Sequence, residues 1–481
     1  MRARRKMPPG VAASERFFLA FALTGRLQTR SMPVAPQVTR PSSAVFGATP
    51  EIAELERLAR YTGTPAYVLF EQSLRDNYAA LHGALTPAQP VRLYYSVKSN
   101  FETGVLATLC DMGSGAEISG GVERLAVERA GFEWSRVVFD GPIKDEAELS
   151  YAIARGVHLV NVESDEEIET LRRLARRAGR RVRIGVRLNP EVPPPAYDRV
   201  FRTFRHKFGF LMRDIDRLAT RLKAIEELEW VALMAHVGSQ VMRADRYLAT
   251  LDQFFAAAAR LRAAGITIGE INLGGGLPAD SMLNVRVPRR FVLARWCERL
   301  GWLQAPAEFA ATMAARIAEH ATALRRTHRL PLTIALEPGR ALVANAGVML
   351  ARVHVVKPPW VFVDVSLNDL PEKLSLCEWR LACPTRVDEP VTQRWHIAGP
   401  TLATQDVLFY DHPVPRLQRG DIIAVLDTGA YSIARANQFT RPRSAVFFVD
   451  VNGELQLIRR GEVAADVLHT QLPANPAATG S

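Results

Sequence analysis

The feature that most constrains the fold of this chain is a regular alternation of short β-type runs with amphipathic helical stretches. Apolar runs rich in β-branched residues occur eight times, at 91–97, 116–119, 137–140, 158–162, 182–188, 231–237, 271–274 and 333–337. The stretches between them have apolar residues at helical spacing and a glycine after the last turn, as at 145–156, 164–179 and 246–265. Eight strands, each followed by a helix, predict an α/β fold with a (β/α)8 TIM barrel, in which active-site groups lie at the carboxyl ends of the strands.

The alternation stops after "GRALVANAG", and short β runs without helical partners follow it. These runs are "GVMLARVHVVK", "WVFVDVSL", "DIIAVLD" and "AVFFVDVNGELQLIRR". We therefore expect a barrel over residues 64–345, a C-terminal β-domain over 346–470 and a flexible tail over 471–481. Two long segments, 190–210 and about 278–305, interrupt the barrel pattern, and loops of such length are usually functional or mobile.

The positive charge of the chain is concentrated at its start. Residues 1–31 hold seven arginine or lysine residues against one glutamate, which is more than half of the net charge of +11. The remainder is only mildly basic and has no stripe of interleaved basic and aromatic residues, so we expect no nucleic-acid partner. Residues 1–45 are predicted to be a disordered basic extension. The apolar run 17–23 imitates a signal peptide but lacks a small-residue cleavage site, which favours an extension or a true start at Met32.

Cysteine spacing and hydropathy predict the compartment. The four cysteines, Cys110, Cys297, Cys377 and Cys383, form no C-x-x-C pair and no zinc-type spacing with histidine. This pattern favours a reducing cytoplasm and no bound metal. No apolar run approaches the ~20 residues that a membrane span needs, so we expect no membrane segment.

Polar residues of particular kinds follow four of the expected strands. Lys98 follows the first strand, His236 and Ser239 the sixth, three glycines the seventh, and Glu337 with Arg340 the eighth. Each of these alone has an ordinary interpretation: a solvated lysine, a hydrogen-bonded core histidine, a tight turn or a local ion pair. In a barrel, however, all of them lie on one rim, so we interpret them together as one site.

The residue types of this rim indicate a phosphorylated cofactor. Gly274, Gly275 and Gly276 allow the backbone to approach a phosphate closely, and barrels commonly bind phosphate after strands seven and eight. Arg340 and Ser239 add hydrogen-bond donors to the same anion. A lysine amine, a stacking imidazole and a carboxylate around a phosphate indicate pyridoxal 5′-phosphate (PLP). "NLGGGLPA" would also satisfy a dinucleotide fingerprint, but the following helix and the acidic residue of that fingerprint are missing.

From about Thr64 to Leu468 the chain resembles the fold-type III PLP-dependent decarboxylases, the diaminopimelate and ornithine decarboxylase family with an alanine racemase-like barrel. The motifs that carry the resemblance are "YYSVKSN", "AEISGGVERLAVERAGF", "HKFGF", "HVGSQ", "NLGGGLP", "EPGR", "VDVSLNDL", "GPTLATQD" and "GAYSIARANQF". The resemblance implies a Schiff base between PLP and Lys98, His236 stacked on the pyridine ring, and Glu337 facing the ring nitrogen to support the electron sink. It further implies phosphate contacts from Ser239, Gly274, Gly275, Gly276, Arg340 and Tyr431, with Glu117 where the family usually has aspartate.

The chain also departs from the family motifs at the substrate end. In "GPTLATQD", Leu402 and Ala403 replace a cysteine and an acidic residue that cross the dimer interface in the family. The arginine that diaminopimelate decarboxylases carry after "NDL" is missing, and Pro371, Glu372 and Lys373 follow instead. The candidate substrate-binding residues are Asp364, Leu402 and Ala403. Leu402 has no proton to give. Either Lys98 or an ordered water then donates the proton to Cα, or Leu402 shapes the pocket for an apolar part of the substrate.

These observations predict a PLP-dependent carboxy-lyase that decarboxylates an amino acid or amino-acid conjugate, as a homodimer with shared active sites. Two alternatives stay open at this point. One is a PLP-dependent racemase or epimerase of the same fold. The other is a catalytically silent PLP-binding homologue that acts as a regulatory partner, although the presence of Lys98, Glu337 and the phosphate donors argues against it.

Overall fold

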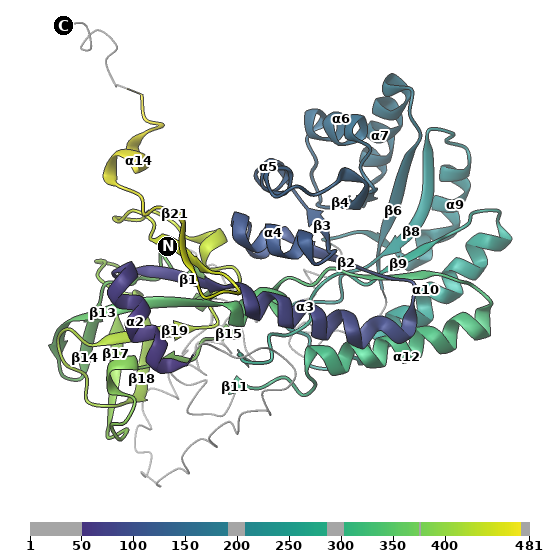
Figure 1. The fold of residues 1–481 in the computed structure, drawn as a ribbon. Coiled ribbons are helices and arrows are strands. Elements are labelled where there is room, and N and C mark those ends of the chain that lie inside the picture. Colours follow the sequence, from purple (N-terminus) through teal and green to yellow (C-terminus); the bar gives the residue numbers. More distant parts are fainter. Residues whose placement is uncertain (1–50, 191–206, 286–302, 375–376, 473–481) are drawn as a thin grey trace, which may run out of the picture. The chain divides into compact units, whose positions relative to one another are not determined.

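A computed structural model describes residues 51–190, 207–285, 303–374 and 377–472 (Figure 1). The predicted extension 1–45, most of the two long segments at 190–210 and 278–305, and most of the tail 471–481 lie outside the described residues.

Eight parallel strands form a closed barrel, as the sequence predicts. They are β2 (Val91–Ser96), β3 (Gly115–Ile118), β4 (Val137–Phe139), β5 (Leu159–Val162), β6 (Val182–Asn189), β8 (Leu228–Met234), β9 (Glu270–Asn272) and β12 (Thr333–Leu336). Each strand pairs with the next along the chain, and the pairing of β12 with β2 closes the ring, with Ile334 opposite Val91. The short strand β7 (Phe210–Leu211) pairs in parallel with the end of β6, with Phe210 opposite Leu188. The carboxyl ends of all eight strands therefore meet at one rim.

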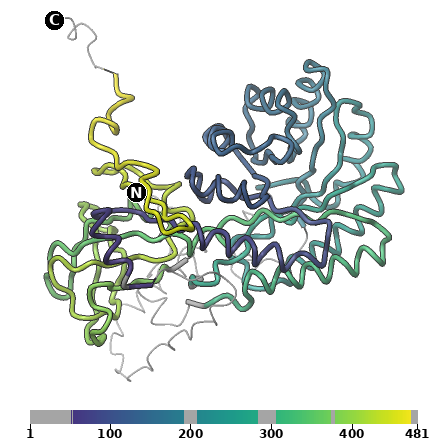
Figure 2. Tube along the Cα trace, in the orientation of Figure 1, coloured from purple at the N-terminus to yellow at the C-terminus, as the bar shows by residue number. Residues whose placement is uncertain are grey.

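Helices on the outside of the barrel follow the strands. They are α4 (Thr103–Asp111), α5 (Gly121–Arg129), α6 (Glu146–Arg155), α7 (Asp165–Ala178), α9 (Ile215–Lys223), α10 (Asp245–Ala263) and α12 (Ala310–His328). After β12 only the four-residue α13 (Arg340–Val343) follows. Helix α3 (Glu71–Leu85), which precedes the first barrel strand, packs beside α12 on the outside of the barrel. Two segments far apart in the sequence therefore lie side by side (Figure 2).

Helix α7 shows why these stretches are helical. Its N-cap Ser164 accepts a hydrogen bond from the backbone N–H of Glu167, and Gly179 ends the helix in the left-handed conformation at φ 61°. Its apolar residues Ile168, Leu171, Leu174 and Ala175 recur at helical spacing and are buried against the barrel. Burial of each leucine or isoleucine contributes roughly 1.5–3 kcal/mol to folding.

The chain from residue 347 onward forms a mostly β-sheet domain, also as predicted. Its sheet has the order β18 (Val407–Val414), β17 (Gln393–Ala398), β14 (Trp360–Val363), β13 (Gly347–Lys357), β1 (Ala66–Phe70), β20 (Ala445–Val449) and β21 (Leu455–Arg459). Strand β19 (Ile422–Leu426) joins β13 to β16 (Leu381–Ala382). Helix α2 (Ile52–Thr62) packs on β13 and β19, and the short helix α14 (Ala464–Leu468) follows β21. A separate small sheet is formed by β10 (Leu283–Val285), β11 (Leu303–Gln304) and β15 (Cys377–Glu378).

Strand β1 lies in the β-domain although residues 66–70 fall inside the range 64–345 expected for the barrel. It is antiparallel to β13 and parallel to β20, with Tyr67 opposite both Met349 and Val446. All five of its residues are buried, as in a central strand covered on both faces. The first described strand therefore belongs to the same sheet as the last ones.

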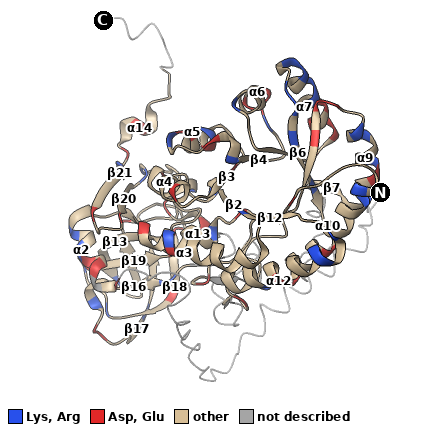
Figure 3. Cartoon of the chain, turned by 45° about the vertical axis from the view of Figure 1, so that its right-hand side comes forward, with Lys and Arg blue, Asp and Glu red and all other residues tan. Residues whose placement is uncertain are grey.

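Basic and acidic residues alternate on the outer helices of the barrel, as Figure 3 shows for α7 and α9. Asp165 of α7, for example, accepts hydrogen bonds from Arg217 and Arg221 of α9. No helix in the described ranges is both long enough and apolar enough to cross a membrane.

Candidate active site

Lys98 lies directly after β2, in a single turn η2 (Val97–Ser99), at the barrel rim. Its Nζ donates a hydrogen bond to Glu117 Oε2 at 2.5 Å, and Ser96 Oγ donates to the same oxygen at 2.6 Å. The Glu117 side chain is 1% exposed, whereas that of Lys98 is 43% exposed. Burial lowers the pKa of Lys98, but the charge of Glu117 outweighs it and raises the pKa above that of an ordinary lysine. The ammonium group is thus anchored on a buried carboxylate and open to the rim.

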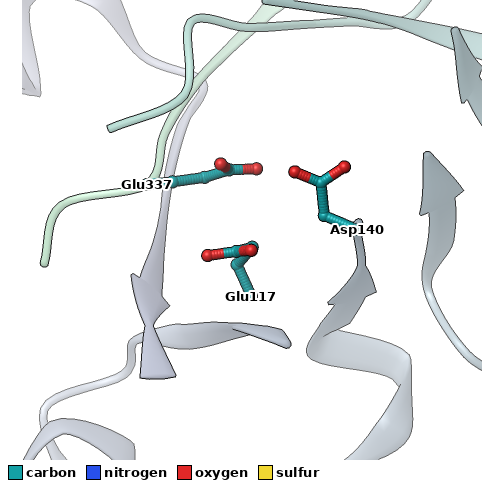
Figure 4. A group of neighbouring side chains, drawn as sticks. All are labelled: Glu117, Asp140 and Glu337. Carbon is teal, nitrogen blue, oxygen red and sulfur yellow. The ribbon is translucent and has the colours of Figure 1, made fainter. Parts of the chain in front are cut away.

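Three buried carboxylates converge beside this lysine. Glu117 comes from β3, Asp140 follows β4 and Glu337 follows β12, and their oxygen atoms lie within 4.8 Å of one another (Figure 4). Asn272 Nδ2 donates to Glu337 Oε1 at 2.8 Å. Burial, together with the charges of Glu117 and Asp140, raises the pKa of Glu337 well above its ordinary value. Among the described residues, Glu117 Oε1 and Asp140 Oδ1 have no hydrogen-bond partner, so the cluster has acceptor atoms left for a cationic group or an N–H donor.

Arg187 of β6 places a positive charge next to Asp140, one of the three carboxylates. Its Nη1 lies 3.5 Å from Asp140 Oδ2 and 3.4 Å from Glu163 Oε1, and the residue is 8% exposed. Its guanidinium carbon also lies 4.6 Å from the ring centroid of Phe208. Arg187 therefore offsets part of the negative charge of Asp140.

His236, after β8, is held as a neutral imidazole. The backbone N–H of Gly275 donates to His236 Nδ1 at 3.3 Å, so Nδ1 carries no proton. Desolvation by the surrounding barrel mouth, helped by the positive charges of Arg187 and Lys98, lowers the pKa of His236 to about 4, while the residue itself keeps an exposed surface at the rim. The imidazole is consequently uncharged near neutral pH and presents an aromatic face at the rim.

The three glycines after β9 form a tight backbone cradle between the β8 and β12 loops. Gly274 and Gly276 have φ of 68° and 94°, which favours glycine. A Cβ on Gly276 would lie 2.1 Å from the carbonyl oxygen of Gly238, and one on Gly275 would lie 2.6 Å from that of Glu337. Tyr247 Oη donates to the Gly275 carbonyl at 2.8 Å, which fixes the loop. Any side chain here would push the loops apart.

The β-domain contributes Tyr431 to the same rim. The backbone N–H of Tyr431 donates to the carbonyl of Ser99 at 2.8 Å, and Asn100 Nδ2 donates to the carbonyl of Gly429 at 2.9 Å. Tyr431 adopts the left-handed conformation at φ 56°, which is uncommon for a residue with a side chain. The guanidinium carbon of Arg340 lies 4.8 Å from its ring centroid. The segment after β19 is thus docked directly beside Lys98.

This arrangement fits PLP. The orphaned acceptor atoms of the carboxylate cluster suit a protonated pyridine nitrogen, and the side-chain-free cradle with Arg340 suits a phosphate. The Lys98 amine lies at the same rim, and an amine is the group that would bind the aldehyde carbon of this cofactor.

The comparisons with known proteins agree with this fit. Residues 71–344 match the family described as "Pyridoxal-dependent decarboxylase, pyridoxal binding domain". The chain belongs to this family. Among curated relatives, it is 30% identical over 416 residues to diaminopimelate decarboxylase of Pseudomonas aeruginosa, covering 85% of this chain and 93% of the relative. The corresponding protein of Aquifex aeolicus is 29% identical over 418 residues, covering 86% and 92%. The solved structure of diaminopimelate decarboxylase from M. jannaschii has the same fold, with a TM-score of 0.75, 24% identity, and coverage of 88% and 94%.

The sequence-based identification of a fold-type III PLP-dependent decarboxylase is therefore confirmed. The chain is a PLP-dependent carboxy-lyase that acts on an amino acid, and PLP is its cofactor.

The structure brings most of the predicted cofactor residues together and leaves the predicted substrate residues apart. Ser239 is exposed three residues after His236. Asp364 follows β14 in the β-domain, where its Oδ1 accepts a hydrogen bond from the Arg352 backbone N–H at 2.8 Å and its Oδ2 lies 3.5 Å from His354 Nε2. Leu402, which is 98% exposed, and the half-buried Ala403 lie on the loop between β17 and β18. These three substrate candidates share no described hydrogen bond or ion pair with Lys98 or the carboxylate cluster.

Sequence reasoning missed two residues that the structure places in the candidate site, Asp140 and Arg187. Both stand near the carboxyl ends of predicted strands, 137–140 and 182–188, which is where a barrel places functional groups. A charged residue at the carboxyl end of a predicted barrel strand is the sequence signal that could have identified both as site residues. Their pairing depends on how far apart β4 and β6 lie across the rim, which no local pattern specifies.

Proposed function

We propose that Lys98 is the residue of this decarboxylase that binds PLP covalently and that Glu337 faces the ring nitrogen. The observation that supports this most is the convergence of the Lys98 amine and the buried carboxylates Glu117, Asp140 and Glu337 on one rim. When bound, PLP supplies an electron sink that stabilises the carbanion left after Cα loses CO₂. A carboxylate beside the ring nitrogen keeps that nitrogen protonated, which is the condition for the electron sink.

The other rim residues are proposed to orient the cofactor. Neutral His236 packs its imidazole face on the pyridine ring. Ser239, Arg340, Tyr431 and the Gly274–Gly275–Gly276 cradle hold the phosphate, since a guanidinium, hydroxyl groups and closely approaching backbone are all suited to an anion. Glu117 holds the Lys98 ammonium in place through the 2.5 Å hydrogen bond.

Lys98 is also the proposed proton donor to Cα after CO₂ departs. Leu402, which replaces the family cysteine, has neither a proton to give nor a charge. The pKa of Lys98 is raised by Glu117, so its Nζ is protonated at neutral pH and lies at the rim. An ordered water is the alternative donor. A lysine on one face of the substrate gives a single product stereoisomer in heavy water, whereas water gives a mixture.

The substrate is proposed to be an amino acid or amino-acid conjugate other than diaminopimelate or ornithine. The curated relatives carry the name diaminopimelate decarboxylase. Against a shared substrate stand three departures: Leu402, Ala403, and the segment Pro371, Glu372 and Lys373 where the family has an arginine after "NDL". Within this segment Glu372 is buried and ion-paired, so the third departure reaches inside the molecule.

A homodimer with shared active sites and a reducing cytoplasmic location complete the proposal. Leu402 is 98% exposed on a loop that in the resembling family contributes to the partner's site. Burial of this leucine against a partner subunit would lower the free energy of the complex, because it removes apolar surface from water. Cys110 and Cys383, whose side chains are described, are both free thiols, as in a reducing compartment.

The decisive experiment is a panel of free and carrier-linked L- and D-amino acids, monitored for CO₂ release and for α-proton exchange in heavy water. A decarboxylase releases CO₂ in proportion to the substrate consumed. A racemase or epimerase exchanges the α-proton without CO₂ release, and a silent homologue binds PLP with neither signal. Either of the last two results with the whole panel contradicts the proposed function.

A further inference from the structure

A pocket of about 870 Å³ lies in the β-domain. Its wall is formed by three segments: the end of β13 with the turn after it (354–356 and 358–359), the start of β17 (393–395), and the loop between β18 and β19 (416–419). Small-molecule sites have volumes of roughly 300–1,000 Å³, so the pocket is large enough for a small ligand. It shares no described lining residue with the candidate active site.

Backbone hydrogen bonds hold the three segments of the wall against one another. The N–H of Gly420 donates to the Val353 carbonyl at 2.8 Å, and the N–H of Val353 donates to the Asp421 carbonyl at 2.9 Å, so the loop before β19 is fixed on β13. The N–H of His396 donates to the Pro359 carbonyl at 2.9 Å, which fixes β17 on the turn after β13. The position of the wall is therefore set by the backbone of the sheet.

The wall of this pocket is basic. Arg394, Arg416 and Arg419 line it, and no aspartate or glutamate is among the described lining residues. Arg394 is paired, since its Nε lies 3.3 Å from Asp411 Oδ1. Arg416 and Arg419 are exposed, and within the described ranges their side chains make no hydrogen bond or ion pair. The N–H donors of these two guanidinium groups are therefore available to a ligand.

The carboxylates next to the wall have other partners. Asp421, at the end of the loop, accepts a hydrogen bond from Arg386 Nε at 3.0 Å and one from the Gln418 backbone N–H at 2.7 Å. Asp364 Oδ2 lies 3.5 Å from Nε2 of His354, which lines the pocket. Neither carboxylate is ion-paired with the two arginines of the loop, so in the part of the chain that the structure describes their positive charge has no ion-pair partner.

Much of the rest of the wall is apolar. Val355 is 51% exposed, and Pro358 and Pro359 are exposed as well. Trp395, which is only 4% exposed, has an indole Nε1 with no described hydrogen-bond partner, an uncommon state for a buried N–H. An apolar group that covered the valine and the prolines would remove their surface from water, a gain of about 25 cal/mol per Å². The wall therefore combines anion-binding donors with apolar surface.

We propose that this pocket binds a small organic anion, with a phosphate or carboxylate group at Arg416 and Arg419 and an apolar part against Val355. A guanidinium group presents a planar fork of N–H donors that matches the oxygens of either anion. The volume leaves room beyond one such group, which favours an organic molecule over an inorganic ion. Strand β19 follows the arginine loop and Tyr431 follows β19, so the pocket lies at the opposite end of this strand from the candidate active site.

The test measures binding to the holoenzyme by calorimetry. The probes are 2-naphthyl phosphate, 2-naphthoate, the neutral 2-naphthol and inorganic phosphate. The double variant Arg416→Gln/Arg419→Gln removes the two loop charges. Its matched control, Arg177→Gln/Arg181→Gln, removes the same charge from two exposed arginines at the end of α7 whose side chains also make no described hydrogen bond or ion pair. Melting temperatures and the visible absorbance of bound PLP show that each variant is folded and loaded.

We expect the double variant to bind the preferred naphthyl anion at least about tenfold more weakly than wild type, the equivalent of one charged hydrogen bond, and the control to bind it as wild type does. Binding of 2-naphthol should be the same in all three proteins. A tighter complex with 2-naphthyl phosphate than with 2-naphthoate identifies phosphate as the anion, and the reverse order identifies carboxylate. Inorganic phosphate should bind more weakly than 2-naphthyl phosphate, because it lacks the apolar part.

The proposal is overturned if neither naphthyl anion binds the wild-type holoenzyme with a Kd of about 1 mM or tighter. It is also overturned if Arg416→Gln/Arg419→Gln weakens binding no more than the control does. Equal affinities for inorganic phosphate and 2-naphthyl phosphate would contradict the apolar contact.

Discussion

Lys98 Nζ lies 2.5 Å from Glu117 Oε2, across the ends of the adjacent barrel strands β2 and β3. Ser96 is the strand partner of Glu117, and Lys98 follows two positions later in the turn after β2, so its side chain can reach back to the carboxylate. A lysine that would otherwise be solvated is thereby held on a fully buried carboxylate. This pair connects the fold to the chemistry proposed for this decarboxylase.

Borohydride reduction of the holoenzyme should attach the cofactor to Lys98, which peptide mapping would detect. Lys98→Ala should remove this label together with the yellow colour and lower turnover by at least ~10²–10⁴-fold, because the amine is proposed both to bind PLP and to return the proton. Lys223→Ala, at the end of α9, is the control and should keep both label and activity. A label on a lysine other than Lys98 would refute the assignment.

Glu117→Gln should make PLP capture by the apoprotein less dependent on high pH. Glu117 raises the pKa of Lys98, so removal of its charge lowers that pKa and leaves more free amine at a given pH. The midpoint of the rate of PLP capture against pH should therefore move to lower pH. Glu117→Asp keeps the charge and should retain a midpoint near that of wild type. An unchanged midpoint in Glu117→Gln would mean that the ion pair does not control the amine.

Glu337→Gln should stabilise the apoprotein at alkaline pH. The pKa of Glu337 is raised in the folded state, so its contribution is fully present below the unfolded pKa and is lost as pH rises towards the folded value. Glutamine carries no buried charge and should raise the free energy of unfolding by about 1–3 kcal/mol at high pH, with no gain at low pH. Denaturant unfolding of both apoproteins across pH measures this. The rate of the PLP-dependent reaction should fall in the variant. If the free energies of unfolding of wild type and variant change in parallel with pH, the buried-charge interpretation is contradicted.

Asp140→Asn should weaken PLP binding by about tenfold, because it removes one negative charge from the cluster proposed to receive the pyridine nitrogen. The change preserves the size of the side chain and an oxygen facing Arg187. Fluorescence titration of the apoprotein with PLP gives the Kd. Asp364→Asn is the matched control, since that carboxylate lies in the β-domain against Arg352, and it should bind PLP as wild type does. Equal effects of the two variants would exclude a special role for Asp140.

Leu402→Asp should shift the protein from dimer to monomer at a given concentration. If the 98%-exposed Leu402 is covered by a partner chain, each copy loses roughly 1.5–3 kcal/mol of apolar burial in the variant. Sedimentation equilibrium measures the dimer dissociation constant. Val391→Asp alters another exposed apolar residue of the β-domain and should leave that constant unchanged. A wild-type monomer with full turnover would end the proposal of shared active sites.

The sequence by itself determined the barrel and the main residues of its rim. Apolar runs and helical spacing are local properties, and eight alternations leave a closed parallel barrel as the expected arrangement. Because the carboxyl ends of parallel strands meet at one rim, Lys98, His236, the glycine run and Glu337 could be assigned to one site without coordinates.

The tertiary structure alone decided which distant segments meet. Strand β1 joins the β-domain sheet because its buried faces need β13 and β20, which lie more than 270 residues later in the chain. Asp140 enters the carboxylate cluster because of the positions of β3, β4 and β12 around the rim. Glu372 meets Arg340 and Arg435, 32 and 63 residues away, only when the β-domain is docked on the barrel. Contacts of this kind depend on how whole helices and strands pack together. Residue patterns along the chain are local and do not specify the distance between such elements in space.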